Sequence, residues 1–194
     1  VVAAIDAQRP TFESLGCATF EAIADFGDAR EVFHVQRAQI FAATHAEHYA
    51  RHRDLLKDTI VWNVEQGLKL TARQIADAEL KRTALFERVY EFFERYEFLI
   101  LPTAQVLPFP VEEPWVGEID GRPMADYLEW MTSCWIITVT GHPAVSVPCG
   151  FSPEGLPIGV QIVGRYRDDF GVLQLAYAFQ QATQFRKRSP PLAA

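Results

Sequence analysis

The five serines of the chain are the residues to test first for nucleophilic chemistry. They are Ser14, Ser133, Ser146, Ser152 and Ser189. A catalytic serine needs an adjacent base and backbone N–H donors for the developing oxyanion, which a Gly/Ser-rich segment commonly supplies. No serine here lies in such a segment. The four lysines lie on polar helix faces or in loops, where burial does not favour a neutral amine; they are Lys57, Lys69, Lys81 and Lys187. The sequence therefore assigns no catalytic residue.

Ser146 and His142 are the one pair that resembles a nucleophile and its base. His142 lies four residues before Ser146, and Ser146 lies within a predicted strand. Successive residues of a strand point to opposite faces, and His142 precedes the strand. We therefore assign Ser146 no catalytic role.

Three histidines share one face of a predicted helix and could together bind a metal ion. His45, His48 and His52 are spaced i, i+3, i+7, with Glu47 beside them. The alternative is that they are half-buried helix residues that continue an apolar stripe. The chain has no HExxH motif and no second acidic cluster at ligand spacing. We favour the alternative and expect neither a metal nor a cofactor.

The three cysteines, Cys17, Cys134 and Cys149, are odd in number and form no CxxC pair. This pattern favours free thiols in a reducing cytoplasm over a disulfide framework. Cys149 follows Pro148 and has no nearby cation or helix N-terminus that would activate a thiol. We interpret Cys149 as a buried structural residue.

An aromatic group could line a substrate pocket or could anchor the core, and the sequence leaves both interpretations open. The group consists of Trp115, Tyr127, Trp130 and Trp135.

Charge and hydropathy exclude two classes of partner. The net charge is −7 and the pI is near 5.2, so no basic surface is expected for nucleic acid. No apolar run is long enough to span a bilayer, and the first ten residues lack the pattern of a signal peptide. We expect a cytoplasmic protein that binds neither nucleic acid nor membrane.

Local patterns predict an alternation of helices and strands. Helices are expected over residues 2–15, 28–56, 71–96 and 124–130, and strands over residues 17–23 and 98–101. Residues 57–69 are mixed, with a break at Gly67. Thr71 and Gln74 form a capping box. Residues 102–123 are rich in Pro and Gly and predict a long loop. A last helix begins at Asp168 or Asp169 and ends at Pro190 and Pro191. The chain thus opens in the middle of an α/β pattern.

Residues 144–164 predict a central β-hairpin. Period-2 alternation lies on both sides of the turn Ser152-Pro153-Glu154-Gly155. Small residues share one face, Ala144 and Ser146 on the first strand and Gly159 on the second, so another group can pack closely against that face.

This stretch carries a resemblance to a known family. GHPAVSVPCGF, a turn and GLPIGVQIVGR, together with FLILPT at residues 98–103 and DDFGVLQLAYAFQQAT near the end, are similar to the C-terminal region of the amidase signature family. The resemblance implies an α/β fold: the C-terminal part of an α/β/α sandwich, with a mixed sheet flanked by helices. We expect residues 1–194 to form a single α/β unit of this kind.

The resemblance also implies a function. The family hydrolyses carboxylic amides with a Ser–cis-Ser–Lys triad, which none of these segments contains, so we expect a missing N-terminal catalytic half and no activity of this chain alone. Residues 133–141 align with a segment that roofs the active site, where Ile136 replaces the usual Pro and Thr138 the usual Asn. Five residues are carried over as contacts to a small amide substrate: Thr103, Trp135, Ile136, Thr138 and Gln161. The alternative is a non-catalytic binding or scaffold domain, and a homo-oligomer stays open.

Overall fold

The computed structural model describes residues 1–188, and the chain divides into two compact units. Unit 1 contains residues 1–24 and the residues from Tyr90 onward, and unit 2 contains residues 25–89. The expectation of one unit over residues 1–194 stays a prediction, and the two units are described separately.

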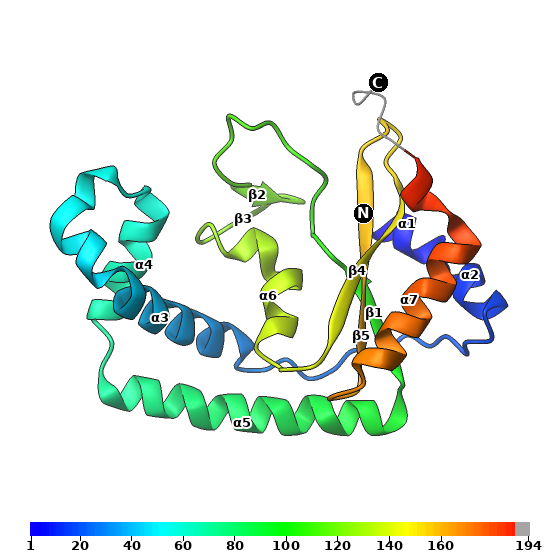
Figure 1. Cartoon of the computed structure of the whole chain (residues 1–194), viewed down its shortest axis with the longest axis horizontal. Coiled ribbons are helices and arrows are strands. Elements are labelled where there is room, and N and C mark those ends of the chain that lie inside the picture. Colours follow the sequence, from blue (N-terminus) through cyan, green and yellow to red (C-terminus); the bar gives the residue numbers. More distant parts are fainter. Residues whose placement is uncertain (189–194) are drawn as a thin grey trace. The chain divides into compact units, whose positions relative to one another are not determined.

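The sheet of unit 1 has three antiparallel strands in the order β1-β5-β4 (Figure 1). They are β1 (Phe98–Pro102), β4 (Ala144–Phe151) and β5 (Pro157–Gly164). The predicted hairpin pairing is confirmed: β4 pairs with β5 from Ala144↔Val163 to Phe151↔Pro157, with an irregularity between Pro148 and Gly150. The predicted central position is right for β5 but wrong for β4, which lies at the edge of the sheet that the described residues form. Pro148 has no N–H to give to a ladder, which fits an interruption at this point. Because β1 pairs with the other edge of β5, β5 is the central strand.

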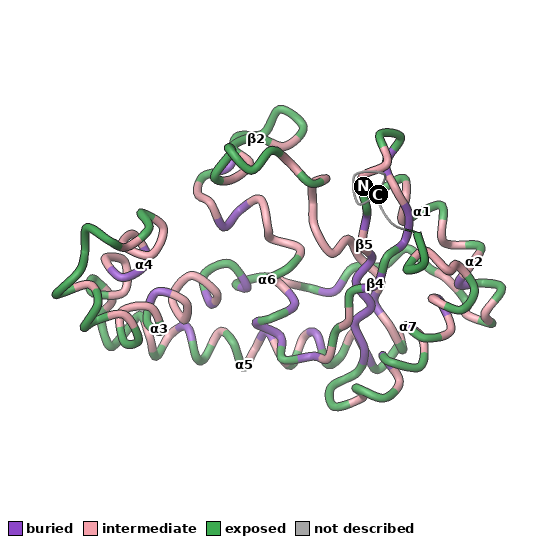
Figure 2. Tube along the Cα trace, turned by 45° about the horizontal axis from the view of Figure 1, so that its top comes forward, coloured by how far each residue is buried: buried purple, intermediate pink, exposed green. Residues whose placement is uncertain are grey.

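The core of unit 1 lies between this sheet and the helices α2 (Arg9–Ser14) and α7 (Asp169–Thr183). Val160, Ile162 and Phe179 are fully buried, and Figure 2 shows buried residues concentrated in the sheet. The ring of Phe12 stacks on Phe179 with centroids 4.8 Å apart. Of the two predicted starts of the last helix, Asp168 is the one that caps α7, by accepting from the Gly171 N–H at 3.0 Å. The predicted end of α7 at Pro190 and Pro191 lies outside the described residues, and the helix itself ends at Thr183.

The N-terminal segment departs from the prediction in two places. The helix over residues 2–15 is broken into α1 (Val2–Asp6) and α2, which has Pro10 in its first turn, where its missing N–H costs least. Gly16 follows at φ +92°, the left-handed conformation that ends helices. The predicted strand over residues 17–23 is wrong: this segment forms no strand, and Ile23 is 81% exposed. Alternation alone cannot hold a strand, since no neighbour within residues 1–188 pairs with it.

The segment between β1 and β4 is mostly irregular, as its Pro and Gly content predicts. It contains the short pair β2 (Glu118–Ile119) and β3 (Arg122–Pro123). The predicted helix over residues 124–130 is wrong. The Asp126 carboxylate accepts from the N–H groups of Leu128 and Glu129 at 2.9 and 3.1 Å and forms a turn instead. The 3₁₀ helix η2 (Glu129–Met131) then leads into α6 (Thr132–Thr138).

Unit 2 consists of helices, with α3 (Ala29–His52), η1 (Arg53–Leu55), α4 (Asp58–Leu68) and the first part of α5 (Ala72–Arg95). The Thr71–Gln74 capping box is confirmed, with Gln74 N–H donating to Thr71 Oγ1 at 3.2 Å and Thr71 N–H donating to Gln74 Oε1 at 2.9 Å. The predicted break at Gly67 falls one residue before the end of α4 at Leu68. A Cβ on Gly67 would lie 2.1 Å from the Ala38 carbonyl oxygen, so the glycine permits close packing of α4 on α3.

Candidate functional site

Thr103 follows β1 directly and joins three segments of unit 1. Its N–H donates to the Gly159 carbonyl on β5 at 3.2 Å. Its own carbonyl accepts from Ser133 Oγ at 3.1 Å and from Cys134 Sγ at 3.0 Å, both in the first turn of α6. Gln161, which is buried on β5, donates from Nε2 to the Ser133 carbonyl at 3.1 Å. The structure therefore brings two of the five predicted contact residues, Thr103 and Gln161, into one hydrogen-bonded cluster.

A pair of hydroxyl groups lies across the central strand. Thr103 Oγ1 and Ser146 Oγ are 2.7 Å apart, one donating to the other. A Cβ on Gly159, between them, would lie 3.0 Å from Thr103 Oγ1 and 3.2 Å from Ser146 Oγ. The small residue at position 159 therefore leaves room for the pair. The predicted close packing against this face is confirmed for Ser146 and Gly159.

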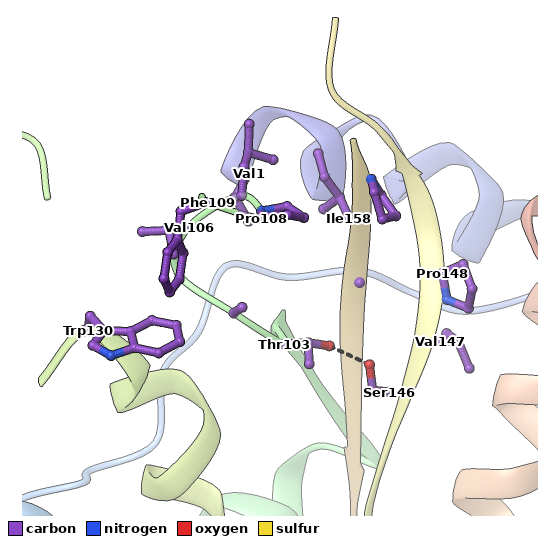
Figure 3. Close-up of a pocket in the computed structure, with 14 residues that line it drawn as sticks. Val1, Thr103, Val106, Pro108, Phe109, Trp130, Ser146, Val147, Pro148 and Ile158 are labelled. Carbon is purple, nitrogen blue, oxygen red and sulfur yellow. Dashed lines mark hydrogen bonds between the residues drawn. The ribbon is translucent and has the colours of Figure 1, made fainter. Parts of the chain in front are cut away.

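These two hydroxyls lie in the wall of a pocket of about 460 Å³ (Figure 3). The other walls come from the loop after β1, from η2 and from the hairpin. Phe109 packs edge-on against Trp130 with centroids 5.3 Å apart. The lining residues are Val1, Thr103, Ala104, Val106, Leu107, Pro108, Phe109, Trp130, Ser146, Val147, Pro148, Pro157, Ile158 and Gly159. The volume lies within the range of small-molecule sites.

The other three predicted contact residues lie elsewhere on α6. Trp135 is buried and donates from Nε1 to the Leu128 carbonyl at 2.9 Å, so it anchors the packing of α6. Thr138 is exposed, and its hydroxyl donates to the Cys134 carbonyl one turn earlier at 3.3 Å. Ile136 is half-buried. None of these three residues lines the pocket, and neither does Gln161, so Thr103 is the one predicted contact residue in the pocket wall. Contact of all five residues with a substrate stays a prediction.

Among the residues that line this pocket, the sequence assigns a substrate contact to Thr103 alone. Trp130 belongs to the aromatic group that the sequence leaves between two roles, and the structure gives it a place in the pocket wall whereas Trp135 anchors the core. Phe109 and Pro108 lie in the Pro/Gly-rich loop. Because this loop has no helical or strand periodicity, the sequence does not indicate which of its side chains face the pocket. Only the length of that loop indicates a role.

The chain matches the model of the amidase family over residues 11–173. It belongs to the amidase signature family. The resemblance carried by the hairpin is thereby confirmed.

Relatives and solved structures extend the match. The chain is 39% identical over 115 residues to the glutamyl-tRNA(Gln) amidotransferase A subunit of Thermodesulfovibrio yellowstonii, covering 59% of this chain and 22% of that protein. The corresponding protein of Moorella thermoacetica is 43% identical over 115 residues, with 58% and 22% covered. Among structures, 6-aminohexanoate cyclic dimer hydrolase complexed with substrate gives a TM-score of 0.83 at 24% identity over 99% of this chain. A bacterial aryl acylamidase gives 0.81 at 23% identity over 95%.

This chain spans only part of the length of the relatives and structures that it matches. The matched part is about a fifth of the curated relatives' length, and this chain spans 43% and 40% of the two structures. At this identity the structural likeness shows the fold alone, and it confirms the predicted α/β class with helices flanking the sheet.

For a chain of the amidase signature family, the serines and lysines are the residues most relevant to catalysis. Within residues 1–188, each serine hydroxyl has a hydrogen-bond partner: Ser14 donates to Thr11 O, Ser133 to Thr103 O, Ser146 pairs with Thr103, and Ser152 accepts from the Leu156 N–H. Lys81 pairs with Glu31 on the surface of unit 2. None of these contacts joins a serine to a lysine.

The other two residues considered for catalysis, His142 and Cys149, do not line the pocket. His142 Nδ1 lies 3.1 Å from the Thr140 carbonyl and the ring stacks on Phe93 at 5.0 Å, whereas Ser146 pairs with Thr103. Burial lowers the pKa of His142, which the Thr140 carbonyl opposes. Cys149 lies in the core, as predicted, where burial raises its pKa to about 11.

The three-histidine face forms no metal site. His45 is half-buried and lies 5.2 Å from the Phe41 ring, whereas His48 and His52 are exposed. No group of three or more His, Cys, Asp or Glu residues within residues 1–188 is placed to hold a metal ion. Over the same range, no helix is both long and apolar enough to traverse a bilayer.

Proposed function

We propose that this chain is the C-terminal substrate-pocket part of an amidase signature enzyme that hydrolyses the C–N bond of a carboxylic amide. The observation that carries the proposal is the family match over residues 11–173, in a chain whose central hairpin forms one wall of a small-molecule pocket. The pocket orients the amide, and a serine supplied by another part of the enzyme attacks its carbonyl carbon. The enzyme acts in the cytoplasm, where the free thiols Cys17, Cys134 and Cys149 stay reduced.

The chain alone hydrolyses no amide through a serine. Acyl transfer needs a nucleophile, a base and oxyanion donors held together, and no serine within residues 1–188 bonds a lysine or a histidine. The chain spans less than half of its structural relatives, which leaves room in the complete enzyme for the triad that the family uses.

The test uses a serine-reactive fluorophosphonate probe and a panel of aryl and aliphatic amides. The purified chain should show neither stoichiometric labelling nor turnover above buffer. A complete enzyme that includes this chain should show both. Labelling of one serine of the chain with accompanying turnover would overturn the claim of inactivity, and a complete enzyme without amide hydrolysis would overturn the proposed reaction.

A non-catalytic binding domain is the second candidate, and the observation that favours it is a formed pocket without a nucleophile–base pair. Gel filtration and thermal melting of the isolated chain separate the two. A cooperative monomer that buries its own hairpin favours a binding domain. An oligomer or aggregate that binds apolar dyes favours a part of a larger enzyme.

A further inference from the structure

The pocket beside Thr103 and Ser146 has no ionisable side chain in its lining. Charged residues make up 22% of the chain. If the 14 lining residues had the same composition, about three of them would be charged. The lining contains none. Its polar side-chain groups are the two hydroxyls and the indole of Trp130. Ser146 is exposed, so a charged ligand group would keep part of its hydration, but the part that lies against the apolar wall would lose water without gaining an opposite charge.

The hydroxyl pair determines which polar group fits. Within the pair, one hydroxyl donates to the other at 2.7 Å, so one O–H donor and several lone pairs remain for a ligand. A neutral amide both donates and accepts hydrogen bonds, so it can use the remaining O–H donor as well as the lone pairs. A carboxylate can only accept, and an amidinium can only donate. Gly159 lets the ligand approach, since a larger residue there would crowd both hydroxyls.

The remaining walls are flat or branched apolar groups. Trp130 and Phe109 pack edge to face on one side, and Val106, Pro108 and Ile158 complete the wall (Figure 3). Aromatic and branched apolar substituents fill such a space with favourable contact area.

We propose that this pocket holds an uncharged aryl or branched alkyl substituent of the amide substrate, with the amide group against the Thr103–Ser146 hydroxyl pair. The inference rests on the proposed function and adds the class of amide: neutral and apolar on the side that this part of the enzyme binds.

The experiment compares three ligands of one shape: 4-methylbenzamide, 4-methylbenzoate and 4-methylbenzamidine. Titration calorimetry on the N-acetylated chain, so that the amino group of Val1 carries no charge, gives the three Kd values at low and high salt. We expect the neutral amide to bind roughly tenfold tighter than either ion, because each ion leaves a charge unpaired. Equal or tighter binding of the benzoate or the benzamidine at high salt would overturn the proposal.

Substitutions in the pocket wall test whether the ligand binds in this pocket. Ser146→Ala and Thr103→Val each remove one hydroxyl and should weaken binding of the amide by roughly two- to tenfold. Val106→Asp adds a carboxylate to the wall and should make the benzamidine the tightest ligand. Val111→Asp is the matched control, since Val111 lies on the same loop, is 91% exposed and does not line the pocket. Far-UV circular dichroism verifies that each variant is folded.

Two outcomes separate this inference from the proposed function. If Val106→Asp and Val111→Asp change the ligand preference equally, the pocket is not the binding site, whatever the complete enzyme hydrolyses. If the amide preference and its reversal by Val106→Asp hold while a complete enzyme hydrolyses no amide, the pocket assignment stands and the proposed reaction fails.

Discussion

Thr103 is the residue at which β1, β4, β5 and α6 meet. Its N–H, carbonyl and hydroxyl are bonded to Gly159, to Ser133 and Cys134, and to Ser146. Each of these bonds contributes about 1 kcal/mol, and together they set the position of the loop that forms the pocket wall. The hydroxyl is thus part of a rigid surface, which suits recognition of one ligand orientation.

His142 should make the protein less stable in acid. Its folded-state pKa is lowered, mainly by burial, below the ordinary value of 6.5. The unfolded chain therefore binds more protons below about pH 6.5, and stability falls as pH decreases from there to the folded pKa. The slope from one proton is at most about 1.4 kcal/mol per pH unit. Urea unfolding between pH 7.5 and pH 5 measures it.

The variant His142→Gln should flatten this pH dependence. His48→Gln is the control, since His48 is exposed on α3, and it should leave the difference between the two pH values unchanged. An unaltered slope in His142→Gln would show that other groups cause the loss of stability.

At the scale of elements, glycine positions decide how closely helices pack. Gly67 lies in α4, with the Ala38 carbonyl 2.1 Å from where its Cβ would be and the Ala42 Cβ 2.6 Å away. Helix propensity favours alanine over glycine by about 1 kcal/mol. The clash involves backbone atoms that cannot rotate aside, so it outweighs this gain.

Gly67→Ala should therefore lower the free energy of unfolding by about 1–3 kcal/mol. Gly117→Ala is the matched control, because no atom lies within 4 Å of its added Cβ, and it should change stability by less than about 0.5 kcal/mol. Chemical denaturation of both variants measures the difference. A Gly67→Ala variant as stable as the parent would mean that α3 and α4 pack less closely than the structure has them.

At the scale of the whole molecule, the prediction that Thr138 on α6 contacts the substrate can be tested in a complete enzyme. Thr138 is exposed, and its hydroxyl bonds the Cys134 carbonyl of its own helix. Thr138→Val should therefore change stability by no more than about 0.5 kcal/mol. In a complete enzyme it should shift the ratio of kcat/KM for two amides by roughly threefold or more.

The matched control for Thr138→Val is Thr44→Val. Thr44 is also exposed and also donates to a carbonyl one turn earlier, that of Ile40, at 2.8 Å. It should leave the substrate ratio unchanged. Equal ratios in the two variants would remove Thr138 from the proposed substrate contacts.

The sequence by itself determined the features that depend on neighbouring residues. The hairpin followed from period-2 alternation around a turn, and the Thr71–Gln74 and Asp168 caps from side chains three residues from the N–H groups they bind. The family followed from the motif that the same hairpin carries. Such signals are local, and tertiary contacts did not override them.

Only the tertiary structure decided the features that depend on distant residues. Thr103 and Ser146 are 43 positions apart, and no local pattern indicates that their hydroxyls meet. Gly67 lies next to the end of α4, but no local pattern indicates its close packing against Ala38, because Ala38 lies on another helix. Residues 17–23 alternate like a strand but pair with none in the described chain. Trp130 and Trp135 look alike in sequence, and the turn at Asp126 and the start of α6 decide which one reaches the pocket. The different positions of Trp130 and Trp135 are thus determined by long-range packing and not by composition.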